Sequence, residues 1–107
     1  MSSDLIKTGH VYLLKDWNLI NTYKIGITTR SVQIRIKELN QCPGSAVKLE
    51  YLSPISNRYK IVEKKLHKIF KNQNTYTGEN LSLKEWFVLS EANYQLLKAL
   101  LKYEFEV

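Results

Sequence analysis

The chain has 107 residues, 44% of them hydrophobic and 24% charged, which fits one globular domain with a single core. No run approaches the roughly 20 apolar residues that span a bilayer, and residues 1–7 lack the basic and apolar segments of a secretory signal. We therefore expect no membrane segment and a cytoplasmic or nuclear protein that is not secreted. The lone Cys42 excludes an internal disulfide, and the net charge of +6 favours a polyanionic partner such as nucleic acid.

Short apolar runs predict the strands. Residues 10–14 and 23–27 are rich in β-branched and aromatic side chains and are separated by turn-forming residues, which predicts an antiparallel hairpin with a long loop. Apolar and polar residues alternate from Val47 onward, as in a half-buried strand that ends at Pro54. Residues 85–89 form either a brief strand or another extended segment.

Helical spacing follows three potential capping sites. Ser31 is expected to cap a short helix that ends before residues 41–44, and Ser90 a last helix that runs through Leu101. Ser56 or Asn57 is expected to cap the middle helix. The residues predicted to form its apolar face are Ile61, Val62, Leu66, Ile69 and Phe70.

These elements predict a single α+β domain with a small, mainly antiparallel three-stranded sheet flanked by helices. Its core covers about residues 9–89, its C-terminal helix covers residues 90–104, and residues 72–79 form a loop between helix and strand.

Several short motifs occur in a fixed order along this pattern. They are His10-Val11-Tyr12, Tyr23-Lys24-Ile25-Gly26, Arg35, Glu63 with His67, and Glu85-Trp86-Phe87. In this order and spacing the chain resembles the GIY-YIG nuclease superfamily, in particular the branch found in phages and large DNA viruses. The resemblance covers roughly residues 9–89.

The resemblance implies a metal-dependent endonuclease, a hydrolase that cleaves DNA phosphodiester bonds with a single Mg²⁺ or Mn²⁺. In that chemistry Tyr12 orients or deprotonates the attacking water, and Arg35 directs its guanidinium at the phosphate. Glu63 holds the metal, which stabilises the leaving oxygen. His67, one turn later on the same helix, assists as an acid, as a partner of the metal ligand or as a phosphate contact.

The second motif leaves two residues open for the place of the family's tyrosine. Neighbouring strand residues point to opposite faces, so Tyr23 and Lys24 do not both reach the site without a bulge. A register counted from Gly26 favours Lys24. The pKa of tyrosine is about 10, so Tyr12 needs a neighbouring cation, Lys24 or Arg35, to act as a base.

The family's late asparagine also has more than one candidate in this chain, namely Asn72, Asn74 and Asn80. Glu85-Trp86-Phe87 is most simply a packing element, in which Glu85 bonds a nearby backbone or basic group.

Four cations are predicted to bind the nucleic-acid backbone: Lys60, Lys64, Lys68 and Arg30. Two other functions fit the same sequence. One is a DNA-binding module that keeps the nuclease fold with weak or no turnover, and the other is a small phage or viral protein-interaction domain. No feature of the sequence indicates a particular oligomeric state.

Overall fold

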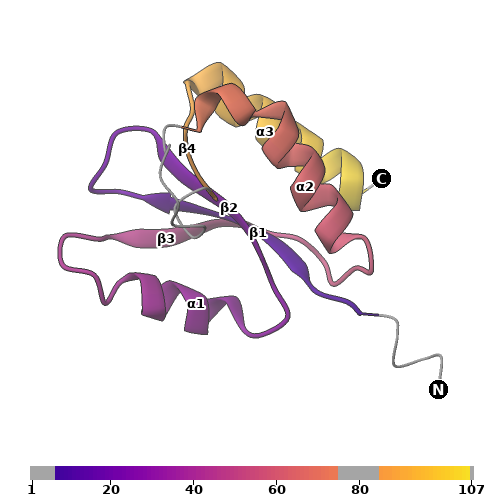
Figure 1. Cartoon of the computed structure of the whole chain (residues 1–107), viewed down its shortest axis with the longest axis horizontal. Helices are drawn as coiled ribbons and strands as arrows, with labels where there is room; N and C mark the ends of the chain where they lie inside the picture. The colour runs from indigo at the N-terminus through magenta and orange to yellow at the C-terminus, as the bar shows by residue number, and fades with distance from the viewer. Residues whose placement is uncertain (1–6, 75–84, 107) are drawn as a thin grey trace.

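A four-stranded antiparallel sheet organises the chain (Figure 1). The computed structural model describes residues 7–74 and 85–106. The strand order is β3-β1-β2-β4, so the first strand lies inside the sheet and pairs with β2 and β3. The elements in chain order are β1 (His10–Asp16), β2 (Thr22–Thr28), α1 (Val32–Leu39), β3 (Val47–Leu52), α2 (Tyr59–Ile69), the 3-10 turn η2 (Lys71–Gln73), β4 (Trp86–Val88) and α3 (Glu91–Phe105).

The helices form one layer on each face of the sheet, with α1 on one side and α2 with α3 on the other (Figure 1). This arrangement follows from β1, whose buried residues alternate between the two faces. Val11 and Leu13 belong to the core beneath α2 and α3, whereas Tyr12 and Leu14 pack with Val32 of α1. Because both faces of β1 are covered, its sequence is a continuous apolar run.

The two cores differ in size. The fully buried cluster on the α1 face has four residues, Tyr12, Leu14, Val32 and Val47. The cluster beneath α2 and α3 has twelve: Val11, Leu13, Tyr23, Ile25, Tyr59, Val62, Leu66, Phe70, Phe87, Leu89, Leu97 and Leu101. Since burying a large apolar side chain contributes about 1.5–3 kcal/mol, most of the hydrophobic stabilisation lies on the α2 and α3 side.

Two of the predicted helix caps are confirmed and one is wrong. The side chain of Ser31 accepts a hydrogen bond from the Gln33 backbone at the start of α1, and Ser90 does the same for Asn93 in α3. Neither Ser56 nor Asn57 is the N-cap of α2. That position is Arg58, whose side chain makes no capping bond, while the Ser56 hydroxyl, two residues earlier, accepts from the Arg58 backbone and not from a helical N–H of α2.

The predicted apolar face of α2 is only partly correct. Val62, Leu66 and Phe70 are buried, but Ile61 and Ile69 are 66% and 45% exposed. With 3.6 residues per turn, Ile61 lies about 100° from Val62 on the side away from Leu66, so it falls outside the contact with the sheet. Ile69 is the last residue of α2, where the helix ends.

The α+β class and the antiparallel hairpin are confirmed, but the sheet has four strands instead of three. The difference is the segment 85–89, part of which pairs with β2 as β4. Among the described residues, no helix is long and apolar enough to cross a membrane.

Candidate active site

Tyr12 on β1 and Gly26 on β2 are neighbours on adjacent strands, and the two residues fit together closely. They are direct partners in the β1–β2 register. A methyl group at Gly26 would overlap the Tyr12 ring, with only 2.7 Å to its Cε1 atom. Glycine at this position therefore leaves room for the phenol to lie flat against β2 on the α1 face.

Lys24 lies on the same face as Tyr12, two residues before Gly26 on β2. Its side chain is 0% exposed, and its Nζ atom is 2.8 Å from Oε1 of Glu85, which is 30% exposed. Burial lowers the pKa of Lys24, while the bond to Glu85 opposes this shift. The pair therefore joins a buried cation to a carboxylate that water reaches.

Tyr23 points to the opposite face, as strand alternation requires. Its ring is buried and stacks on Tyr94 of α3 at a centroid distance of 4.7 Å. Tyr23 is thus a core residue, and Lys24 is the member of the pair that lies beside Tyr12.

Arg35 approaches the sheet from α1. The Tyr12 hydroxyl beside its guanidinium raises the pKa of Arg35. Burial raises the pKa of Tyr12, and the neighbouring Arg35 lowers it by less than burial raises it. A cation is therefore next to Tyr12 as predicted, but the expected net lowering of the tyrosine pKa is not found.

The end of α1 is tied to β3 through Asn40. Its Nδ2 donates to the Val47 carbonyl at 3.0 Å, and its Oδ1 accepts from the Val47 backbone N–H at 2.7 Å. These two bonds fix where α1, and with it Arg35, sits over the sheet.

Glu63 and His67 lie on α2 and reach the edge of β2. Pairing between β2 and β4 runs only as far as Lys24 and Trp86. The next carbonyl, that of Ile25, accepts a hydrogen bond from Nε2 of His67 at 2.8 Å. The same nitrogen is 3.9 Å from Oε2 of Glu63, so this bond to the strand also places the glutamate at the strand edge.

Glu63 is 17% exposed. Burial, followed by the negative charge of Glu85, raises its pKa to about 7, and Lys24 opposes the shift. Residues from four elements and from the position just before β4 thus act on one another within a single region, which we call the Lys24 cluster. Its members are Tyr12, Lys24, Arg35, Glu63 and Glu85.

Glu85 was expected to bond a nearby backbone or basic group, and its partner is the basic residue Lys24. Its place in the Lys24 cluster was not predicted. The signal in the sequence that could have indicated it was the Glu85-Trp86-Phe87 motif. Of the asparagines, Asn74 donates from Nδ2 to the Trp86 carbonyl at 3.0 Å, and Asn72 is exposed. Asn80 lies outside the described residues.

The Lys24 cluster offers hard oxygen ligands to a cation, but few of them. Among residues 7–74 and 85–106, no group of three or more His, Cys, Asp or Glu side chains is placed to hold a metal ion. Mg²⁺ commonly uses one or two carboxylates and keeps several waters. Glu63 with Glu85 nearby fits that mode of binding and no richer coordination.

The cations predicted to bind nucleic acid are all exposed. Lys60, Lys64 and Lys68 follow one another at four-residue spacing and form a stripe along α2. Within the described part of the chain none of the three pairs with a carboxylate, whereas Arg30 bonds Glu38 at 3.1 Å. The lysine stripe therefore presents more uncompensated charge than Arg30.

The T5orf172 domain model matches residues 9–103, nearly the whole chain. The chain belongs to the T5orf172 domain family. This phage-associated domain is found in nuclease-like proteins, so membership is compatible with nucleic-acid interaction. No curated protein and no solved structure gave a match. In this T5orf172 domain the match includes every residue of the Lys24 cluster.

Proposed function

We propose that this T5orf172 domain is a metal-dependent endonuclease that hydrolyses DNA phosphodiester bonds. The observation that carries the proposal is the Lys24 cluster, which gathers a tyrosine, two cations and two carboxylates from separate elements. Perturbed titratable groups that converge in this way are typical of catalytic sites. The family and the exposed lysine stripe on α2 support the same function.

Arg35 and Tyr12 bind and orient the reacting groups. Arg35 keeps its charge at all physiological pH values and presents N–H donors that match phosphate oxygens. The raised pKa of Tyr12 keeps its hydroxyl protonated near neutral pH. Tyr12 therefore orients the attacking water through a hydrogen bond instead of deprotonating it.

Lys24 takes the place of the tyrosine in the second motif of the GIY-YIG superfamily. Lys24 is 0% exposed, so its ammonium acts on the site through Glu85, the carboxylate that water reaches. Glu85 holds the ammonium in position.

Glu63 would hold a single Mg²⁺ or Mn²⁺, and the charge of Glu85 acts on Glu63. When bound, such an ion stabilises negative charge on the leaving oxygen. Glu63 must lose its proton first, because only the carboxylate binds the cation. His67 is a positioning residue, because its Nε2 already donates a hydrogen bond to the Ile25 carbonyl.

Plasmid nicking in Mg²⁺ or Mn²⁺, with a metal-free control, tests the proposal. We expect Glu63→Ala to abolish nicking, and Arg35→Ala to reduce the rate by about 10²–10³-fold, the usual loss for one donor to a reacting oxyanion. Glu91→Ala removes an exposed carboxylate from α3 and should nick normally. If Glu63→Ala cleaves like the unmodified protein while folding normally, Glu63 has no part in catalysis.

A second candidate is a DNA-binding module without turnover. It is favoured by the lysine in place of the family's tyrosine and by the raised pKa of Tyr12. Steeply salt-dependent DNA binding without nicking in either metal would select this function.

A further inference from the structure

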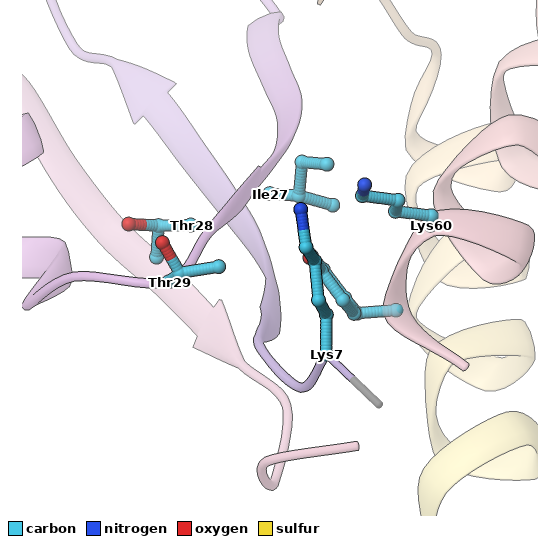
Figure 2. A pocket seen from close by; sticks show the side chains of 6 residues that line it. Lys7, Ile27, Thr28, Thr29 and Lys60 are labelled. Atoms are coloured by element: carbon cyan, nitrogen blue, oxygen red, sulfur yellow. The ribbon is translucent and has the colours of Figure 1, made fainter. Parts of the chain in front are cut away.

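A hollow of about 470 Å³ lies outside the Lys24 cluster and shares no residue with it. It is formed where the end of β2, the start of α2 and the segment before β1 meet. The residues that line it are Lys7, Ile27, Thr28, Thr29, Tyr59 and Lys60 (Figure 2).

The hollow is positively charged. Lys7 and Lys60 enter it from different parts of the chain, and Figure 2 shows Lys7 between the two threonines and Lys60. None of the described residues that line it is acidic, and neither lysine forms an ion pair within the described ranges. By contrast, Arg58 and Lys65 of the same helical region both bond Glu104.

The floor of the hollow is rigid. Tyr59 is buried and packs against Gly9, where an added methyl group would lie 2.8 Å from the tyrosine ring and from the Thr28 carbonyl. Gly9 is in turn bonded to Ser56 through both of its backbone groups. Tyr59, the neighbour of Lys60 at the start of α2, is therefore held against the strand end.

Two elements connect the hollow to the Lys24 cluster. On β2, Thr28 is four positions after Lys24, about 13 Å at the rise of a strand. On α2, Lys60 is three positions before Glu63, about 4.5 Å at the rise of a helix. His67 bonds Ile25 and so ties the two elements together between the cluster and the hollow.

We propose that this hollow binds a backbone phosphate of the nucleic-acid substrate, away from the phosphate that is cleaved. The inference rests on the proposed action on nucleic acid. The ammonium groups of Lys7 and Lys60 supply the charge, and the exposed Thr29 supplies a hydroxyl donor. Separations of about 5–13 Å correspond to about one to four nucleotides along one strand of a duplex. The bound strand thus runs along β2 and α2 past the Lys24 cluster.

The test compares two variants that remove the same amount of charge. Lys7→Ala/Lys60→Ala empties the hollow of its cations, whereas Lys48→Ala/Lys102→Ala removes two exposed lysines from β3 and α3. Binding of a short DNA duplex is measured by fluorescence anisotropy in EDTA over a series of salt concentrations. The absence of divalent metal keeps this readout independent of turnover.

We expect Lys7→Ala/Lys60→Ala to bind at least tenfold more weakly and to reduce the slope of log K against log salt by about 1, as for one lost phosphate contact. The control pair should change the slope by less than half as much. Equal slopes for the two double variants would overturn the proposal, since they would show a general charge effect.

Inorganic phosphate is the second probe and separates the two sources of the anion. Saturable NMR shifts at the Thr29 and Lys60 amides with phosphate, combined with unchanged DNA binding by Lys7→Ala/Lys60→Ala, would assign the hollow to a free anion and overturn the nucleic-acid site. Lys7→Ala/Lys60→Ala can lower the salt slope of DNA binding while the unmodified protein nicks no plasmid. That result would support the phosphate site and reject the proposed nuclease activity.

Discussion

Replacing Glu85 by glutamine is the most informative single perturbation of this domain. It removes a negative charge 2.8 Å from the Nζ atom of a fully buried lysine and keeps the shape of the side chain. Lys24→Met is the matched opposite change, because it removes the buried cation and leaves a carboxylate that is 30% exposed.

The two variants should differ strongly in stability. Removing one partner of a fully buried ion pair costs about 3–5 kcal/mol, and we expect about 2–3 kcal/mol for Glu85→Gln because water reaches this carboxylate. Lys24→Met should cost less than about 1 kcal/mol, since apolar replacements of buried charges are often neutral. At this chain length, Glu85→Gln should lower Tm by about 10–20 °C.

The loss should also depend on pH. Burial already lowers the pKa of Lys24, and without Glu85 it falls further. Above that lowered pKa the folded protein has released a proton that the unfolded chain keeps until about pH 10.4, so stability rises with pH in this window. The difference in the free energy of unfolding between Glu85→Gln and the unmodified protein should therefore become smaller from pH 7 toward pH 10.

Thermal and urea unfolding at pH 7 and pH 9 measure both effects, with Glu91→Gln as an exposed control that should unfold like the unmodified protein. The reasoning is refuted if Lys24→Met is as destabilising as Glu85→Gln, or if the loss in Glu85→Gln is the same at both pH values.

Three further predictions concern the residues around this pair. Gly26→Ala should displace the Tyr12 ring, cost about 1–3 kcal/mol and abolish nicking; a variant with full activity and an unchanged melting temperature would contradict the close fit. Mn²⁺ affinity, measured by calorimetry, should rise about tenfold per pH unit below pH 7 and level off above it, because protons compete for Glu63; a flat profile would exclude Glu63 as the ligand. His67→Ala should leave the Ile25 carbonyl without its donor and cost about 1–3 kcal/mol in urea unfolding, whereas an unchanged midpoint would show that the bond contributes nothing.

Much of the fold was predictable because its signals are local. The apolar run of β1, the hydroxyl caps at Ser31 and Ser90 and the spacing along the helices depend on neighbours a few residues away. Ile61 and Ile69 were misplaced because periodicity gives the width of an apolar face less well than its centre. Which residues meet the sheet depends on how α2 packs.

The candidate site was predictable in part for the same reason. Strand alternation and the register from Gly26 favoured Lys24 over Tyr23, and the structure places Lys24 beside Tyr12. Glu85 is 61 positions from Lys24 along the chain, and only the pairing of β4 with β2 brings it close. The net shift of the Tyr12 pKa likewise depends on burial, which a linear motif does not reveal.

The unequal cores assign Arg35 to the less firmly held layer of the molecule. The cluster between α1 and the sheet has four buried residues, of which Val32 is on α1, and Asn40 holds the end of the helix, whereas the cluster beneath α2 and α3 has twelve. Local opening is least costly where few apolar contacts are lost, so we expect α1 to separate from the sheet at a lower cost than α2 or α3. Such an opening would withdraw the Arg35 guanidinium and uncover Tyr12, while Lys24, Glu63 and Glu85 would stay with the larger core. Arg35 is thus the member of the Lys24 cluster whose position depends most on the smaller core.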